Sequence, residues 1–487
     1  MKYVLALDQG TTGSTALVIS QDGRVVGKGY REITQHYPRP GWVEHDPDEL
    51  FSKTCAAARE AIQASGVKPE CIGITNQRET VILWNRETGR PVAPAIVWQD
   101  RRTAARCAEL APHAPEIARR TGLVTDPYFS ATKLEWLLAS AASGDTTKLL
   151  AGTVDTWLIW RLTNGATHAT DPTNASRTML YDIDARAWSP WACELFGIPM
   201  QLLPDVRASS GSFGTAAVEH IGLDLPILGV AGDQQAALYG QGCVREGQAK
   251  NTYGTGAFLL LNTGSSRPTP GGGMLTTLGC GPRGEIAYAI EASIFIAGAA
   301  VQWLRDGLQI IDAAAETEAL ARSLPSNEGV YFVPALTGLG APHWEAEARG
   351  TITGLTRGTT RAHLVRAALE AMTYGTADVI DAMRAHANHS LDVLRVDGGA
   401  AANDWLMQYQ SDVLGVPVER PDSVETTALG AGALAGVAAG IWRDAEEFVA
   451  PRQFTRFAPG GSDAARQARR GWSRSVRAAL VWARDSG

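Results

Sequence analysis

The sequence predicts an α/β fold built from two duplicated domains that face each other. Two apolar runs joined by a turn rich in glycine and threonine open the chain at residues 4–19, and the same strand–turn–strand pattern returns at residues 249–261. In each half a buried strand also leads through a glycine turn into a helix, at residues 227–238 and 395–406. Because internal self-similarity indicates a duplicated architecture, we expect an N-terminal domain over residues 1–245 and a C-terminal domain over residues 246–487.

The composition is that of an ordinary soluble globular protein, with 45% hydrophobic and 20% charged residues. The net charge of −7 argues against nucleic acid or anionic lipid as the main partner. The six cysteines lie far apart without a C-x-x-C pair, so neither a zinc site nor a disulfide framework is expected. No signal peptide is predicted, because the N-terminus leads directly into a strand. We therefore expect a cytoplasmic enzyme.

The opening turn carries a carboxylate and several hydroxyl groups. Residues 3–7 and 16–19 are apolar enough to be buried strands, which makes Asp8–Thr15 the connecting hairpin. Gly10 would let backbone N–H groups approach an anion, and a carboxylate such as Asp8 can hold a hydrated Mg²⁺. Hydroxyl donors come from Thr11, Thr12 and Ser14. The turn resembles the first phosphate loop of the actin, hexokinase and sugar-kinase ATPase fold; an ordinary polar hairpin is the alternative.

Local signals predict the remaining elements of the first half. Asp46 as a cap, followed by proline and acidic residues, predicts a helix over residues 50–64. A buried strand is predicted at residues 71–75, and residues 76–80 follow directly at its end. Residues 81–84 are expected to pair with residues 94–98. Helices are predicted to open at 99–102 and 128–138.

The second half is predicted by the same reasoning. After its hairpin, a helix is expected over Glu291–Leu304, with Gly298 interrupting one face. A strand, a diglycine turn and a helix are expected over residues 395–406. The uncharged run 428–442 is shorter than the roughly 20 residues of a membrane span and contains four glycines. It is therefore predicted to be a buried, closely packed helix.

Arg78 and Glu79 stand at the end of a predicted strand among apolar neighbours. A surface ion pair is one interpretation. The other is a site for a small polyol, because arginine donates hydrogen bonds to hydroxyl groups and glutamate accepts them. The rings of Trp98, Tyr128 and Phe258 would then cover the C–H face of the polyol, or else belong to the core.

Asp233 is the candidate general base. A carboxylate that follows a glycine at a strand end can simply cap the next helix, but beside a bound hydroxyl and a γ-phosphate it would accept a proton. The turn Gly398–Gly399, with Asn403 one turn on and Thr255 opposite, would complete a nucleotide site. A P-loop enzyme and a protein kinase are excluded, because the sequence has neither a G-x-x-x-x-G-K-[ST] motif nor the H-R-D and D-F-G pair.

Eight motifs, in order along the chain, resemble the FGGY family of carbohydrate kinases. They are Asp8-Gln-Gly-Thr-Thr12, Gly41-Trp-Val-Glu-His-Asp-Pro47, Asn76-Gln-Arg-Glu-Thr80, Ile96-Val-Trp-Gln-Asp-Arg-Arg102, Val154-Asp-Thr-Trp-Leu-Ile-Trp160, Gly232-Asp-Gln-Gln-Ala-Ala-Leu238, Asn251-Thr-Tyr-Gly-Thr-Gly256 and Gly338-Leu-Gly-Ala-Pro342. The similarity runs from residue 3 to about residue 480. It implies two actin-like (ribonuclease H-like) ATPase domains, with ATP and a polyol in the cleft between them.

The resemblance also implies a reaction and its site residues. The expected reaction transfers the γ-phosphoryl group of ATP to glycerol, giving sn-glycerol 3-phosphate and ADP in glycerol catabolism. Asp233 would be the base, and Asp8 would hold Mg²⁺ through water. The glycerol hydroxyls would contact Arg78, Glu79, Tyr128, Asp233 and Gln234, and the glycerol carbons would pack on Trp98 and Phe258. The nucleotide would be lined by Thr11, Thr12, Gly13, Thr255, Gly298, Gln302, Gly399 and Asn403.

The chain departs from the family pattern at Thr15, where an arginine is usual, and this puts one phosphate contact in doubt. Two alternatives remain open: a kinase for another polyol or a ketose, and an actin-like ATPase that serves as a filament or chaperone. Residues 76–79 and Trp98 favour a small triol over a pentulose. A homo-oligomer, dimer or tetramer, is expected, with no nucleic acid or integral membrane association.

Overall fold

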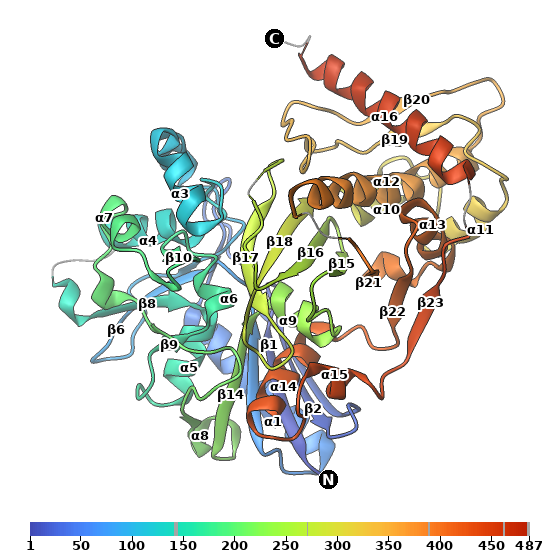
Figure 1. Ribbon diagram of the computed structural model, residues 1–487. Coiled ribbons are helices and arrows are strands. Elements are labelled where there is room, and N and C mark those ends of the chain that lie inside the picture. The colour runs from blue at the N-terminus through green and yellow to red at the C-terminus, as the bar shows by residue number, and fades with distance from the viewer. Residues whose placement is uncertain (141–144, 270, 388–389, 461–462, 485–487) are drawn as a thin grey trace.

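The computed structural model describes residues 1–140, 145–269, 271–387, 390–460 and 463–484, and each half of the chain contains one large β-sheet (Figure 1). The strand order of the first sheet is β13 (Thr215–Ala216), β14 (Leu225–Gly232), β5 (Cys71–Asn76), β1 (Tyr3–Gln9), β2 (Gly13–Ser20) and β3 (Val25–Glu32). The order of the second is β17 (Leu275–Cys280), β18 (Ile286–Ile294), β16 (Ala257–Gly264), β15 (Gln248–Tyr253), β21 (Val393–Asp397), β22 (Val418–Pro421) and β23 (Phe454–Phe457).

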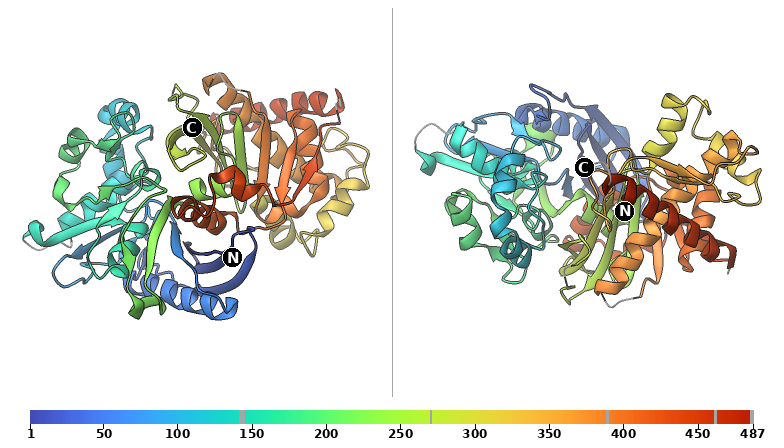
Figure 2. Two further views of the ribbon diagram at one scale, coloured as in Figure 1. Left: turned by 60° about the horizontal axis from the view of Figure 1, so that its bottom comes forward. Right: turned by 90° about the horizontal axis from the view of Figure 1, so that it is seen from above.

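The two sheets repeat one topology. In each, a hairpin and a third strand form an antiparallel unit: β1–β2–β3 in the first sheet and β15–β16–β18 in the second, where β17 adds a further antiparallel strand to β18. Two parallel strands follow on the other side of the hairpin. In the first sheet β5 pairs with β1 and β14 pairs with β5; in the second β21 pairs with β15 and β22 pairs with β21. The predicted duplicated α/β fold is therefore confirmed. In both views of Figure 2 the cyan and green elements of the first half lie on one side and the orange elements of the second half on the other.

A small sheet between residues 44 and 153 extends the first half. Its order is β4 (Glu44–His45), β7 (Ala95–Ile96), β6 (Val81–Asn85) and β8 (Leu149–Thr153). The predicted pairing of residues 81–84 with 94–98 is limited to one residue pair, Val81 with Ile96. The main partner of β6 is instead β8, which pairs along all five residues of β6. Three two-stranded ribbons complete the strands: β9 (Ala169–Thr170) with β12 (Asp205–Val206), β10 (Tyr181–Asp182) with β11 (Ala187–Trp188), and β19 (Tyr331–Val333) with β20 (Thr351–Thr353).

The helices of the first half pack on the sheets and build the outer part of this lobe (Figure 1). The longest, α1 (Pro47–Ser65), begins as predicted, because the Asp46 carboxylate accepts hydrogen bonds from the N–H groups of Asp48 and Glu49. The others are α2 (Ala104–Glu109), α3 (Ala114–Thr121), α4 (Ser130–Ser140), α5 (Val154–Leu162), α6 (Pro172–Ala175), α7 (Pro190–Leu195), α8 (Val218–Ile221) and α9 (Asp233–Gly240). Alternation along β1 sends Leu5 and Leu7 toward α1 and α5, and Val4 and Ala6 toward the other face.

The second half has one long core helix, α12 (Arg361–Ala387), and a C-terminal helix, α16 (Asp463–Arg484). The shorter helices are α10 (Gly298–Gln302), α11 (Glu316–Arg322), α13 (Asp404–Leu414), α14 (Thr426–Ala438) and α15 (Ala445–Val449). The predicted helix over Glu291–Leu304 is wrong at its start, because β18 continues to Ile294 and α10 begins only at Gly298. No helix within the described ranges combines the length and the apolar character that a membrane span needs.

Most of the glycine-rich run lies in helix α14, which returns from the second half to cover the free face of the first sheet (Figure 1). The helix predicted to reach residue 442 is wrong at its end, because α14 stops at Ala438. Ten of its 13 residues are buried, which confirms the predicted close packing. It also crosses α9, where a Cβ atom on Gly430 would lie 1.8 Å from the backbone oxygen of Ala236. Only glycine can occupy a crossing this tight. Helices α9 and α14 thus pack tightly against each other and connect the two halves between their sheets.

Candidate functional site

Arg78 and Glu79 follow the end of β5 and turn into the protein interior. Glu79 has a left-handed backbone with φ 62°, a conformation that is uncommon outside glycine and concentrated at functional sites. Neighbours hold it there: the N–H of Thr80 donates to the Arg78 carbonyl over 2.7 Å, and the Ser130 hydroxyl donates to the Glu79 carbonyl over 3.0 Å. Because both charged side chains are only 2% exposed, the surface ion-pair interpretation is wrong.

The two residues belong to a closed ring of four buried charges, Arg78, Glu291, Arg177 and Glu79, which we call the charge ring. The two Nη atoms of Arg78 donate to the Glu291 carboxylate over 2.7 and 3.0 Å. Arg177 donates to Glu291 over 3.0 Å and to Glu79 over 2.7 Å. Arg78 Nε lies 3.7 Å from Glu79 Oε1, which closes the ring. Two positive and two negative groups balance, as buried charges must.

Sequence analysis singled out neither Glu291 nor Arg177. Glu291 was missed because it was assigned to a helix, whereas it lies in the middle of β18 in the second sheet. A signal was present: Glu291 is the one charged residue in the strand Ile286–Ile294, and a carboxylate buried among apolar residues requires a partner. Nothing local identified Arg177, in the segment after α6, as that partner.

Asp233, the candidate base, lies at the rim of the charge ring. It is the first residue of α9, and the capping position belongs to Gly232, so the interpretation of Asp233 as the cap is wrong. Its Oδ1 atom lies 3.2 Å from Arg78 Nε and accepts a hydrogen bond from the N–H of Gln234 over 2.6 Å. Burial raises the pKa of Asp233, and the Arg78 guanidinium opposes that rise. With its side chain 32% exposed, the carboxylate is ionisable and open to a solute.

Aromatic residues connect this region to the first hairpin turn. The Tyr128 hydroxyl accepts a 3.4 Å hydrogen bond from Arg78 Nη2, and the rings of Tyr128 and Trp98 meet edge to face with centroids 5.6 Å apart. The indole N–H of Trp98 donates to the Thr11 hydroxyl over 2.9 Å. The predicted polyol residues and phosphate turn are therefore in direct contact. Phe258 lies half-buried on β16 in the second sheet.

Gln234, the residue after the candidate base, reaches the second half of the chain. Its side-chain oxygen accepts a hydrogen bond from the ammonium of Lys250 on β15, which also donates to the Thr252 hydroxyl over 2.9 Å. Burial lowers the pKa of Lys250, whereas the nearby carboxylates of Asp397 and Asp233 raise it. A buried cation of the second half therefore stands near Asp233, and it too favours the ionised form of that carboxylate.

The first hairpin turn is tighter than predicted. Asp8 and Thr15 pair across β1 and β2, so the turn is confined to residues 10–12, and Thr11 and Thr12 lie within it while Gly13 begins β2. Burial, together with the carboxylates of Asp233 and Glu425, raises the pKa of Asp8 to about 8. Of these three carboxylates, Asp233 lies beside Arg78 and Glu425 pairs with Lys28, which leaves Asp8 as the one without a cationic partner among the described residues. Within the described parts of the chain, however, no three His, Cys, Asp or Glu side chains form a complete metal cage.

A cavity of about 600 Å³ lies in the second half and collects five of the predicted nucleotide residues. Its walls include Thr255, Gly298, Gln302, Gly399 and Asn403. Thr11, Thr12 and Gly13 do not line it; they belong to the turn of the first half. A nucleotide with its base in the cavity would therefore have to extend its phosphates toward that turn.

The floor of the cavity depends on the turn between β21 and α13. Gly398 has φ 85°, and a Cβ atom there would lie 2.3 Å from the Tyr253 carbonyl oxygen, so glycine is required. Gly399 faces open space. Asn403 caps α13: its side-chain oxygen accepts from the N–H of Leu406 over 2.9 Å, and its amide donates to Thr317 over 3.3 Å. Asn403 thus builds the wall, with much of its hydrogen-bonding capacity already used.

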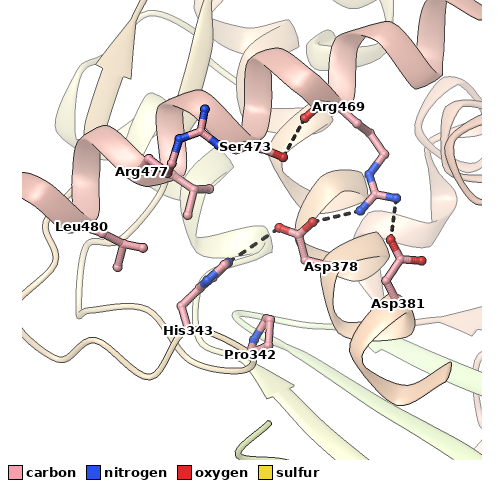
Figure 3. A pocket seen from close by; sticks show the side chains of 9 residues that line it. Pro342, His343, Asp378, Asp381, Arg469, Ser473, Arg477 and Leu480 are labelled. Atoms are coloured by element: carbon pink, nitrogen blue, oxygen red, sulfur yellow. Dashed lines mark hydrogen bonds and ion pairs between the residues drawn. The ribbon is translucent and has the colours of Figure 1, made fainter. Parts of the chain in front are cut away.

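A second hollow, of about 310 Å³, lies between α12, α16 and the loop of Pro342, away from all predicted site residues (Figure 3). Its polar groups are largely paired with one another. Arg469 donates to Asp378 over 3.0 Å and to Asp381 over 2.7 Å, and His343 Nε2 lies 3.7 Å from Asp378. The candidate site therefore comprises the charge ring, Asp233, the first turn and the large cavity.

Known proteins resemble this chain in sequence and in fold. The model of the FGGY family of carbohydrate kinases, N-terminal domain, matches residues 3–240, and that of the C-terminal domain matches residues 249–439. A glycerol kinase of Halorhodospira halophila is 53% identical over 100% of this chain and 98% of its own, and one of Vibrio cholerae is 52% identical over 99% and 98%. The crystal structure of Plasmodium falciparum glycerol kinase with ADP superimposes with a TM-score of 0.94 at 36% identity, covering 99% of this chain and 98% of that one.

The duplicated fold and the matches to both domain models define a two-domain carbohydrate kinase. The chain belongs to the FGGY family of carbohydrate kinases. The family resemblance and the actin-like fold class indicated by the sequence motifs are both confirmed.

Proposed function

We propose that this protein transfers the γ-phosphoryl group of ATP to glycerol, giving sn-glycerol 3-phosphate and ADP. The observation that supports the proposal is the arrangement of Arg78, Glu79 and Asp233: a buried arginine and a buried glutamate lie beside a partly exposed carboxylate that can accept a proton. The names of the relatives, which are about half identical over their full length, support the same substrate.

The residues of the site divide into three roles in this proposal. Arg78, Glu79, Tyr128 and Gln234 would hold the glycerol hydroxyls, with Trp98 and Phe258 against its carbons. The 3.4 Å bond between Arg78 and Tyr128 is the longest that Arg78 makes, and so the one that a hydroxyl most easily replaces. Asp233 would take the proton of the attacking hydroxyl. The nucleotide would lie against Thr11, Thr12, Gly13, Thr255, Gly298, Gln302, Gly399 and Asn403.

We include Mg²⁺ in the proposal, held by Asp8 through water. Mg²⁺ is usually bound by one or two carboxylates together with substrate phosphates, and Asp8, with Asp233 and Glu425 near it, supplies that kind of donor set. When bound, the cation would neutralise charge on the transferring phosphoryl group. Asp8 stands at the end of β1, directly before the turn that carries Thr11 and Thr12.

The wider setting of the enzyme is also a proposal. We propose that the domains divide at residues 245 and 246, within the segment between α9 and β15. The six cysteines, which lie far apart without a C-x-x-C pair, support a cytoplasmic location. A homo-oligomer, dimer or tetramer, stays a prediction from the family resemblance.

A coupled assay of ADP release over a panel of polyols and ketoses tests the proposed function. We expect kcat/KM for glycerol to exceed that for xylulose, ribulose and gluconate by at least about 10²-fold, because a site built to bond hydroxyls discriminates against molecules that leave its polar groups unpaired. Equal turnover of a pentulose would show that the substrate is a ketose. ATP-dependent pelleting without polyol-dependent ADP release would instead favour a filament-forming ATPase.

The departure at Thr15 gives a second prediction. Pairing places Thr15 on the same face of the sheet as Asp8 and as Lys28 on β3, but the Lys28 ammonium is committed to Glu425. We expect Thr15→Arg to lower KM for ATP by about tenfold, since a charge-assisted hydrogen bond contributes roughly 1.5–3 kcal/mol. KM for glycerol should change little.

Thr15→Gln, which has reach but no charge, is the matched control and should leave KM for ATP near the wild-type value. An unchanged KM for ATP in a folded Thr15→Arg enzyme would mean that the phosphates already have their full complement of cations.

A further inference from the structure

The charge ring joins the two halves of the chain beside the proposed polyol residues. Arg78, Glu79 and Arg177 come from the first half, whereas Glu291 comes from the middle of β18 in the second sheet. Glu291 accepts three of the hydrogen bonds in the ring, two from Arg78 and one from Arg177, and its side chain is 0% exposed. One carboxylate of the second half therefore holds both arginines of the first.

Without Glu291 the ring would carry an unbalanced positive charge in a buried place, which is strongly unfavourable. The carboxylates then left near Arg78 are Asp233, 3.2 Å from its Nε atom, and Glu79, at 3.7 Å. Coulombic attraction would draw the free end of the guanidinium toward them. The Nη atoms of Arg78 would then turn away from Tyr128 and add to the contact that its Nε atom already makes with Asp233.

Glu291 also defines the geometry of Glu79 indirectly. Arg177 bonds Glu79 through Nε and Glu291 through Nη2, so a shift of either carboxylate moves the other through one rigid, planar group. The guanidinium of Arg177 lies over the rings of Tyr128 and Phe129, 5.8 and 5.2 Å from their centroids. The charge ring therefore packs directly against the side chains of Tyr128 and Phe129, beside the residues proposed to contact the hydroxyls.

We propose that Glu291 is a positioning residue for the reaction: it holds Arg78 and, through Arg177, Glu79 in the orientation that binds the polyol. By engaging both Nη atoms of Arg78, it also keeps them from adding to the contact that Arg78 Nε makes with the carboxylate of Asp233. This inference rests on the proposed function. It assigns part of the polyol specificity to a residue of the second half, although that residue need not touch the polyol itself.

The test compares Glu291→Gln with the wild-type enzyme in steady-state kinetics and in equilibrium dialysis with ATP. We expect kcat/KM for glycerol to fall about 10²-fold, the usual cost of a misplacement of about 1 Å at a reacting centre. The dissociation constant for ATP without glycerol should stay within about twofold, because Glu291 does not line the large cavity. If Glu291 had only a structural role, its replacement would not lower kcat/KM for glycerol while leaving the dissociation constant for ATP unchanged.

Glu370→Gln is the matched control. Glu370 is also a buried carboxylate of the second half, bonded to an arginine, Arg366, over 2.7 Å, but it lies in α12 outside the charge ring. We expect its kcat/KM for glycerol to stay within about threefold of wild type, even if its thermal stability falls. An equal loss in both variants, or a loss of less than about threefold in Glu291→Gln, would overturn the proposal.

If circular dichroism shows that Glu291→Gln does not fold, Glu291→Asp decides the matter. It keeps the negative charge but shortens the reach, so we expect a folded enzyme with a clear loss of kcat/KM for glycerol; full efficiency would overturn the proposal. Wild-type turnover of glycerol is measured alongside and tests the proposed function alone. Failure of that control is thus distinguishable from failure of the positioning role.

Discussion

Asp233→Asn is expected to lower kcat for glycerol phosphorylation by about 10²–10⁴-fold, the usual effect of removing a general base. The amide has nearly the shape of the carboxylate and can still accept a hydrogen bond from the N–H of Gln234, but it cannot take a proton. Because Asp233 is not the cap of α9, the fold should survive. The measurement is steady-state ADP release at saturating glycerol and ATP.

Asp48→Asn provides the control for this prediction. Asp48 is likewise a carboxylate in the first turn of a helix, α1, and its side chain is 58% exposed, with Arg161 as its partner. Its replacement should leave kcat unchanged, and ATP binding should be retained in both variants. If Asp233→Asn keeps more than about a tenth of the wild-type kcat, Asp233 is a ligand of the polyol rather than its base.

Gly430→Ala should cause the largest loss of stability of any single-methyl addition considered. The new Cβ atom would meet the backbone of Ala236 at 1.8 Å, and backbone atoms of a packed helix cannot rotate away. Overpacking typically costs 1–3 kcal/mol and occasionally more; we expect about 3 kcal/mol here. At roughly 2–4 °C per kcal/mol for a domain of this size, scanning calorimetry should show Tm lowered by about 6–12 °C.

Gly375→Ala is the opposite case and serves as control. Gly375 also lies inside a helix, α12, but a Cβ atom there would only touch Ile294 at 3.9 Å. Alanine is favoured over glycine in a helix by about 1 kcal/mol, so this variant should be slightly more stable. Unchanged stability in Gly430→Ala would mean that α9 and α14 can separate at their crossing without cost.

Features that depend on neighbouring residues could be predicted from the sequence. The two hairpins, the junction of Gly232 with Asp233, the cap at Asp46 and the buried glycine helix all follow from local signals, because turn chemistry, capping and periodicity act over a few residues. The same signals located Arg78 and Asp233 at strand ends, where they proved to lie within 3.2 Å of each other.

Only the tertiary structure decided how these pieces combine. It paired β6 with β8 across more than 60 residues, a choice that no local pattern specifies. It placed five of the predicted nucleotide residues in one cavity and three at a separate turn. It also closed the charge ring with Glu291, which lies 213 residues from Arg78 in the chain. An apolar run can form a strand or a helix. The counter-ion of a buried charge can lie anywhere in the chain, because only the folded structure brings the two side chains together. Local sequence signals therefore predicted candidate site residues at strand ends and turns, and the packing of the two halves determined which of them meet.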